Sequence, residues 1–344
     1  MSAAKNTRLF PIFVRQGGSH TKYKAGYIDH EGHVVVEPIY DQAYPFREGL
    51  GSVRIRDLWA SIDLDGTLAF QPISEFALVF VEGLSEFRFH GKHGVIDRDG
   101  NVVVSPRFRS VSHFSSGLAC VADGSLYGFI NNRGHEVLPP LFDDARPFSE
   151  GFAAVKLGGK WGYISAIGAQ VIEPQFDCGN AMAGPFRQGL ARVARDGKWG
   201  YINPAGEFVI QPQFDMALEF SEGFAEVEVG KRRGFVNTMG EKIVPISYLR
   251  TGRFSEGLAA VSIASGEAHH SISEACETGF INDVGEFVIA PQFICAGRFV
   301  GGLCLVETAK AIGYIERQGQ FVWSSPWVEI GTLDPLHLYP PEQN

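Results

Sequence analysis

The sequence lacks both a long apolar run and a basic cluster. Its 344 residues contain no apolar stretch near the roughly 20 residues that a helix needs to cross a bilayer. Lys and Arg are scattered, and the longest run, Lys231-Arg232-Arg233, is best explained as a solvated hairpin tip. Nucleic-acid binding normally requires a basic face, whereas the formal net charge here is −9. These absences argue against a membrane-spanning protein and against a nucleic-acid binder.

Cysteine and catalytic motifs are also scarce. The five cysteines form no CxxC pair, and their odd number and irregular spacing predict reduced thiols in the cytoplasm. The first ten residues are polar and basic, without the apolar core of a signal peptide, which favours the same compartment. No nucleophile elbow, phosphate loop, paired zinc motif or dinucleotide fingerprint appears. We therefore expect no catalytic residue, no metal and no cofactor.

Glycine and phenylalanine, in contrast, are abundant, with 41 and 27 copies, and they mark an internal repeat. A five-residue marker recurs nine times: an aliphatic residue, a short polar residue, two variable residues and Gly, as in Ile28–Gly32. Six of its eight spacings are 34 residues, and the other two are 38 and 45. The glycines that close the markers are Gly32, Gly66, Gly100, Gly134, Gly168, Gly206, Gly240, Gly285 and Gly319.

Each marker is predicted to be a turn between two antiparallel strands. An Asp or Asn side chain can bond to the backbone two residues on, and the closing Gly accepts the positive φ that such a turn requires. A Phe-x-x-Gly-Leu motif, such as Phe254–Leu258, precedes an alternating strand, and a β-branched run ending in Pro, such as Val34–Pro38, follows the marker. We expect Pro to end that strand because it lacks the N–H group that a ladder needs.

A single unit is therefore predicted to hold three strands. In the fifth unit they cover residues 152–157, 161–164 and 170–173, and a connector follows to residue 188. An aromatic residue usually lies two positions beyond the Pro, as Phe176 does, and is expected to fill the gap between neighbouring units. The predicted strand lengths are normal for globular proteins.

Two segments, Gly159–Ile164 and Gly197–Ile202, both read Gly-Lys-Trp-Gly-Tyr-Ile. With these segments and the other markers, the chain resembles the WG repeats, also called KWG repeats, that are found widely in bacterial proteins. The resemblance covers the chain from about Ala25 to Val322, although most units have lost the Trp, and the second reads Trp59-Ala60. It implies a β-rich repeat scaffold without catalytic residues and often suspected of protein–protein binding.

The Trp-Gly pairs themselves are interpreted as structural. Glycine within a strand permits close approach of another backbone or of an aromatic ring, which the Trp would then cover. The residues of the two complete pairs are Trp161, Gly162, Trp199 and Gly200. An exposed Trp platform for carbohydrate is the alternative interpretation.

The predicted fold class is all-β, with nine three-stranded antiparallel units. A meander with one apolar face cannot bury that face alone, so neighbouring units must cover each other. Propeller blades usually have four strands and about 40 residues or more, and propellers usually have about four to eight blades. We therefore expect an open, curved, right-handed β superhelix (a solenoid), with a closed propeller-like ring as the alternative. The expected regions are an N-terminal lead and first-strand cap (1–24), the repeats (25–322), and a C-terminal cap and tail (323–344).

Specificity is expected where the period breaks. The unit ending at Gly206 has four extra residues near Cys178–Met182, and the unit ending at Gly285 has eleven extra residues in its first hairpin, about Ser265–Glu277. Two adjacent histidines and a distant cysteine are poor metal ligands, so we assign no metal to this insertion. The candidate binding residues are Cys178, Asn180, Met182, Glu267, His269, His270 and Glu274.

The function expected from the sequence is a non-enzymatic scaffold for protein–protein binding. The negative charge permits a basic partner such as a bacterial effector or toxin. A glycan or cell-wall binding module, motivated by the Trp and Tyr residues of the repeat, is the first alternative. A hydrolase that uses His and Asp on the irregular loops is the second.

Overall fold

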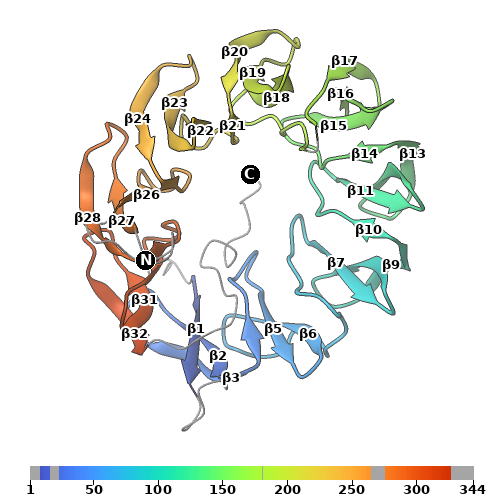
Figure 1. Cartoon of the computed structure of the whole chain (residues 1–344). Helices are drawn as coiled ribbons and strands as arrows, with labels where there is room; N and C mark the ends of the chain where they lie inside the picture. Colours follow the sequence, from blue (N-terminus) through green and yellow to red (C-terminus); the bar gives the residue numbers. More distant parts are fainter. Residues whose placement is uncertain (1–7, 16–22, 180, 265–275, 327–344) are drawn as a thin grey trace, which may run out of the picture. The chain divides into compact units, whose positions relative to one another are not determined.

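The computed structural model describes residues 8–15, 23–179, 181–264 and 276–326 (Figure 1). Within them, all regular structure is β-strand, and no helix is long and apolar enough to cross a membrane. The chain divides into two compact units of similar size. The first contains the described residues up to Gly158 together with Ile164–Ala169, and the second contains Gly159–Tyr163 and the described residues from Gln170 onward.

The strands form nine small antiparallel sheets, numbered here in chain order as blades 1 to 9. Blades 1 to 4 contain β1 (Phe10–Arg15), β2 (Tyr23–Ile28), β3 (Val34–Tyr40); β4 (Gln42–Ala43), β5 (Gly51–Ile55), β6 (Leu58–Ile62); β7 (Leu84–Phe89), β8 (Lys92–Asp97), β9 (Val102–Phe108); and β10 (Ser110–Val111), β11 (Leu118–Asp123), β12 (Leu126–Asn131), β13 (Glu136–Phe142).

Blades 5 to 9 continue the same pattern. They contain β14 (Asp144–Ala145), β15 (Phe152–Leu157), β16 (Lys160–Ser165), β17 (Gln170–Phe176); β18 (Ala191–Arg195), β19 (Lys198–Ile202), β20 (Phe208–Phe214); β21 (Met216–Ala217), β22 (Phe224–Val229), β23 (Arg232–Asn237), β24 (Lys242–Tyr248); β25 (Arg250–Thr251), β26 (Ala259–Ala264), β27 (Cys276–Ile281), β28 (Phe287–Phe293); and β29 (Cys295–Ala296), β30 (Cys304–Glu307), β31 (Ala311–Ile315), β32 (Phe321–Pro326).

The predicted open superhelix is wrong, and the fold class is a β-propeller with nine blades. Every ladder of the described strands lies within one sheet, and no strand joins one unit to the next as a solenoid sheet would. Our sequence argument failed because the connector contributes a further strand of two residues. In blade 4, for example, Ser110 and Val111 pair with Ala122 and Val121. Five blades thereby reach the four strands that are usual in propellers.

The N-terminal lead also contains regular structure. Residues Phe10–Arg15, within the region 1–24 assigned to a cap, form β1 and pair along their whole length with β2. At the other end, β32 extends to Pro326 and pairs with β31. Blade 1 thus has three strands and blade 9 has four, the same numbers that occur in the other blades.

The predicted turns are confirmed. In the first marker, Asp29 Oδ1 accepts hydrogen bonds of 2.9 Å from the N–H groups of both Glu31 and His33. The closing residue, Gly32, has a φ of 87°, and the equivalent glycines of the other eight blades have φ between 77° and 85°. The short polar side chain therefore accepts the backbone N–H groups of the turn, and the glycine adopts the positive φ, as the marker predicted.

The Gly of the Trp-Gly pair is required by the outer strand of the blade. A Cβ on Gly200 would lie 2.5 Å from the carbonyl oxygen of Ile210 and 2.8 Å from the nitrogen of Pro212. The register between β19 and β20 shifts at this point, so the outer strand bulges toward the glycine. Contrary to our expectation, Pro212 does not end the strand. It lies within β20, an edge strand in which a missing N–H is tolerated.

Blade 2 lacks both the glycine and the bulged outer strand. There the glycine is replaced by Ala60, which is fully buried. The sheet of this blade has no regular outer strand, because residues 67–74 contact β6 only through the isolated bridges of Leu68 and Ser74. Without a bulged strand over its Cα atom, position 60 can carry a methyl group.

The core lies between successive blades. Phe108 and Val95 of blade 3 pack against Val121 and Ile130 of blade 4, and all four side chains are buried. In the second unit, Phe293 of blade 8 packs in the same way against blade 9. The aromatic residue beyond the Pro thus fills the gap between neighbouring blades, as predicted.

A second, unpredicted link joins the blades through the Phe-x-x-Gly-Leu turn. The residue before its glycine has a positive φ, for example 51° at Glu222 and 55° at Glu256. The Glu222 carboxylate accepts the N–H groups of Glu256 and Gly257 in the next blade, at 2.7 and 2.8 Å. Further links of this kind run from Glu48 to Gly83, Glu82 to Gly117, Gln188 to Gly223 and Glu256 to Gly302.

Candidate functional site

The position that holds Trp in the complete units varies from blade to blade. Trp161 and Trp199 occupy it in β16 and β19, and both rings are buried, with 1% and 9% exposure. Since these rings are covered, they cannot serve as the exposed platform that the glycan alternative required. In β8 and β23 the same position holds His93 and Arg233, and in both places acidic side chains gather around it.

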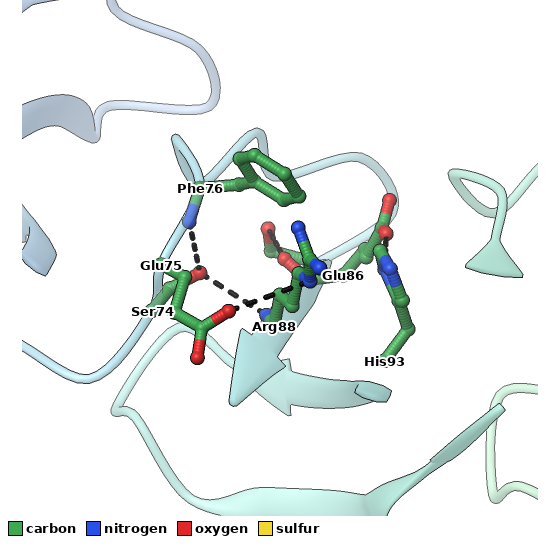
Figure 2. A network of polar contacts seen from close by, with 7 residues as sticks. Ser74, Glu75, Phe76, Glu86, Arg88 and His93 are labelled. Atoms are coloured by element: carbon green, nitrogen blue, oxygen red, sulfur yellow. Dashed lines mark hydrogen bonds and ion pairs between the residues drawn. The ribbon is translucent and has the colours of Figure 1, made fainter. Parts of the chain in front are cut away.

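The first of these gatherings, the Glu86 cluster, lies in blade 3 and the segment before it (Figure 2). His93 Nδ1 contacts the carboxylate of Glu86 across the hairpin of β7 and β8. Arg88, two residues after Glu86 on the same face of β7, pairs with Glu75 at 3.4 Å. Its members are Ser74, Glu75, Phe76, Glu86, Arg88 and His93.

An arginine–aromatic contact and a buried hydroxyl complete this cluster. The Arg88 guanidinium lies 4.7 Å from the centroid of the Phe76 ring, which is 50% exposed. The hydroxyl of Ser74 is fully buried and accepts the N–H groups of Phe76 and Arg88, at 3.1 and 3.2 Å. Ser74 therefore fixes the loop beneath Phe76, and it is not placed as a nucleophile.

Electrostatics set Glu86 apart within this cluster. Burial raises the pKa of its carboxyl group above the ordinary value, although the hydrogen bond from His93 and the charges of His93 and Arg88 oppose the shift. Glu86 and His93 thus form a carboxyl–imidazole contact beside the exposed ring of Phe76. In the described residues no further side chain completes a catalytic triad with them.

A second gathering, the Arg192 ladder, runs through blades 6, 7 and 8. Glu219, in the connector of blade 7, accepts from Arg192 at 3.0 Å and from Arg253 at 3.1 Å. In the same blade, Arg233 pairs with Glu226 at 3.0 Å and with Glu228 at 2.9 Å. The ladder thus contains three cations and three anions, with the Glu219 pairs joining blades 6, 7 and 8 and the Arg233 pairs lying within blade 7.

The two inner carboxylates of the ladder shift in opposite directions. Burial acts to raise the pKa of Glu219, but the charges of Arg192 and Arg253 together with hydrogen bonds outweigh it, and the pKa falls below the usual value. For Glu226, which is 2% exposed, burial dominates over Arg233 and raises the pKa. The Arg192 guanidinium also lies 4.8 Å from the Trp199 ring. The ladder is consistent with a structural role between blades.

The predicted binding residues fall into two groups. Cys178 and Met182 lie in the loop between β17 and β18, where Cys178 is buried and Met182 is 37% exposed. Cys178 also supplies a carbonyl that accepts from the N–H of Ala181 at 3.0 Å. The remaining predicted residues, Asn180, Glu267, His269, His270 and Glu274, lie outside the described residues.

Sequence analysis missed both charged gatherings, although a signal for them exists. When the nine units are aligned on the Trp position, His93 and Arg233 stand out because acidic residues occur on the preceding strand. The register places Glu228 directly opposite Arg233, whereas His93 lies opposite Arg88 and contacts Glu86 diagonally. A loss of Trp accompanied by new charges on the same face is the pattern to search for.

A further group of possible metal ligands occurs in the first marker. The ligand atoms of Asp29, Glu31 and His33 lie within 4.8 Å of one another. However, Asp29 Oδ1 already accepts the two backbone N–H groups of the turn, and Glu31 and His33 are largely exposed. Turn formation accounts for this group, and we assign no metal to it.

The fold was compared with those of solved structures. The structure described as a eukaryotic initiation factor superposes with a TM-score of 0.62 at 10% identity, covering 93% of this chain and 96% of that one. The dihydro-heme d1 dehydrogenase NirN in complex with DHE gives 0.44 at 15% identity, covering 94% and 74%. Hsv2p of Kluyveromyces lactis gives 0.40 at 10% identity, covering 60% and 74%. At these identities the first shows a shared fold alone, and the other two carry no argument.

Comparison with curated protein sequences finds no match. The family model described as "WG containing repeat" matches residues 26–59, 94–126, 127–161, 161–199, 199–232, 234–264 and 279–309. These seven matches cover more than half of the chain, and they omit residues 60–93, where Ala60 replaces the glycine and the regular outer strand is missing. The resemblance seen in the sequence is thereby confirmed, and the chain belongs to the WG containing repeat family.

Proposed function

We propose that this chain is a non-catalytic scaffold that binds another protein. Membership of the repeat family and the propeller fold support a binding role, because such blades present similar surfaces many times over. Two groups of charged side chains in the described residues are best placed for chemistry, the Glu86 cluster and the Arg192 ladder. Within each group, acidic and basic side chains pair with one another. That pairing suits structural positions better than a turnover site.

The observation that carries the proposal is the exposed apolar character of the outer strands. Soluble chains rarely expose large aliphatic side chains in a recurring row, and such surfaces mark interaction sites. Ile39 in β3 is 63% exposed, and Leu141 in β13 is 60% exposed. The other exposed aliphatic residues of these strands are Val34, Val35, Val102, Val137, Val171, Val209 and Val288, at 40% to 49%.

The outer strands also determine how a partner would bind. Each regular one from β3 to β28 contains a proline, such as Pro140 in β13, which offers no N–H group to an added strand. A partner would therefore contact side chains and would not extend the sheet. The net charge of −9 favours a basic partner, and the reduced cysteines expected of the sequence favour the cytoplasm as the place of encounter.

Affinity capture with matched variants tests this proposal. The tagged chain is compared with Ile39→Glu and Leu141→Glu, which place charges on outer strands, and with Ile167→Glu, which changes an 86% exposed residue in a marker turn. A protein that the wild type captures is then purified and titrated against all four chains.

We expect the two outer-strand variants to weaken binding about tenfold or more, as expected when a charge is buried in an apolar contact. Ile167→Glu should bind like the wild type. Failure of the wild type to retain any protein above the level of an unrelated propeller would refute the proposal, as would equal affinity of all four chains.

A further inference from the structure

A pocket of about 340 Å³ lies between β9 of blade 3 and the strands of blade 4. Its inner wall is apolar, formed by Phe108, Val121 and Ile130, all of them buried. Two acidic side chains, Asp123 and Glu136, also line it, and both residues are exposed. The pocket therefore combines an apolar interior with an acidic opening. All of these residues belong to the first unit of the chain.

Glu136 supplies one of the two acidic side chains of this pocket. Glu136 lies opposite Ile130, and the residue in the same register of blade 6 is Phe208, opposite Ile202. Phe208 packs edge-on against Phe176 of the preceding blade, with ring centroids 6.0 Å apart. Val34, Val102 and Phe287 hold this register position in three other blades. In blade 4 the position carries a carboxylate, and in blade 7 it carries the opposite charge, on Lys242.

Asp123 departs from the repeat in the same way. It is the last residue of β11, opposite Leu126. The equivalent residues of blades 2, 3 and 7 are Ile55, Phe89 and Val229, all of them apolar. Two acidic replacements thus converge on one pocket, and both lie on the side of blade 4 that faces blade 3.

Neither carboxylate is neutralised within the described part of the chain. Asp123 and Glu136 make no ion pair and no side-chain hydrogen bond there, in contrast to every acidic residue of the Glu86 cluster and the Arg192 ladder. The one cation that lines the pocket, Arg107, lies with its guanidinium 4.7 Å from the centroid of the Phe108 ring. One positive and two negative charges leave the pocket acidic.

We propose that this pocket binds a lysine or arginine side chain of the partner protein. Such a side chain has an apolar stem, which matches the walls at Phe108, Val121 and Ile130, and a cationic head for Asp123 and Glu136. A purely apolar guest would leave two carboxylates desolvated, and an anionic guest would be repelled. The inference rests on the proposed protein-binding function and names the chemistry of the contact.

Small probes test the pocket without knowledge of the partner. The wild-type chain is titrated with n-butylguanidinium and n-butylammonium, and with n-butanol as the uncharged control, while amide NMR signals are followed. The variant Glu136→Phe fills the pocket with the residue found in blade 6, and Glu136→Gln removes a charge at nearly constant size. Glu37→Gln, an exposed acidic residue of β3, is the matched control. Thermal unfolding of each variant establishes that it is folded.

We expect both cations to shift the signals of Val121 and Ile130 in the wild type and in Glu37→Gln, and n-butanol to shift them far less. Affinity should fall about tenfold in Glu136→Gln, since charge-assisted contacts are typically of this size, and vanish in Glu136→Phe. Equal binding by n-butanol, or unchanged cation binding by Glu136→Phe, would overturn the inference.

The two proposals fail separately. A captured partner that binds Glu136→Phe and the wild type equally would overturn the pocket inference and leave the scaffold function intact. Cation binding at the pocket together with no captured protein would overturn the scaffold function, and with it the assignment of the guest to a partner protein.

Discussion

The carboxylate of Glu222 accepts a hydrogen bond of 2.8 Å from the backbone N–H of Gly257, in the turn of the following blade. The contact ties two blades at a point where the turn backbone has no partner of its own. A similar contact made by Gln188 shows that an amide oxygen can serve in place of a carboxylate.

Replacing Glu222 with Ala should therefore destabilise the chain by about 1 to 2 kcal/mol, because two N–H groups lose a charged acceptor. Glu222→Gln should lose less than half as much, since it retains one acceptor oxygen. Urea unfolding followed by tryptophan fluorescence measures both. Glu173→Ala, at an exposed acidic residue of β17, is the control and should be neutral. A loss in Glu222→Gln equal to that in Glu222→Ala would contradict the assigned role.

Glycine at the Trp-Gly pair should be irreplaceable wherever the outer strand bulges. Gly200→Ala would bring a Cβ within 2.5 Å of the Ile210 carbonyl oxygen, so we expect a loss of about 2 to 3 kcal/mol. At Gly252 the added Cβ would lie 3.6 Å from Ala260, an ordinary contact, and Gly252→Ala should change the unfolding free energy by under about 0.5 kcal/mol. Chemical unfolding of the two variants side by side decides the matter, and equal losses would refute this explanation.

The contribution of Glu219 to stability should depend on pH. Arg192 and Arg253 outweigh the effect of burial and lower its pKa below the ordinary 4.5. A carboxyl whose folded pKa is lowered stabilises the fold above its unfolded pKa and loses that contribution as the pH falls through the folded value. The unfolding free energy of the wild type should therefore exceed that of Glu219→Gln most at neutral pH, with the gap narrowing below about pH 4.5.

Unfolding curves of both chains from about pH 7 to about pH 3 test this dependence. The other carboxyl groups are present in both chains, so their effects largely cancel in the difference. A gap that widens on acidification would contradict the assignment of Glu219 as the ionised centre of the ladder.

The cysteines should differ sharply in reactivity. Burial raises the pKa of Cys120 to about 12 and that of Cys304 well above its usual range, which removes the nucleophilic thiolate. Cys295 is partly exposed, whereas the other four are buried. Iodoacetamide should therefore alkylate Cys295 first in the native chain and all five cysteines after urea unfolding. Peptide mapping by mass spectrometry reads the order, and early labelling of Cys120 would disprove it.

Local structure was predictable because the same turn-forming marker occurs nine times in the sequence. Asp29 and Gly32 have the roles that their types predict, and the strands of blade 5 lie within three residues of their expected ends. The two-residue strands of the connectors were not predictable, since a pair such as Ser110 and Val111 carries no periodic signal. That omission changed the strand count per blade, and with it the choice between superhelix and propeller.

The candidate sites were harder to predict than the fold. Sequence reasoning looked for specificity in inserted residues, and most of the longer insertion, residues 265–275, lies outside the described part of the chain. The charged gatherings and the acidic pocket arise from substitutions that leave the period intact, such as His93 for Trp and Glu136 for an apolar residue. Recognising them requires the register, which shows which positions of neighbouring strands share a face.

The links from Glu48, Glu82, Gln188, Glu222 and Glu256 all run in one direction, from an earlier residue to a later turn. A chain leaving the ribosome would therefore form each new turn after its acceptor had already been made. Each new blade would be linked to the preceding one in the order of synthesis. In a chain that ended early, the acceptor side chain of the last turn would remain in water, and the linked N–H groups of the earlier turns would all have their acceptors. The direction of these contacts thus suits folding during translation.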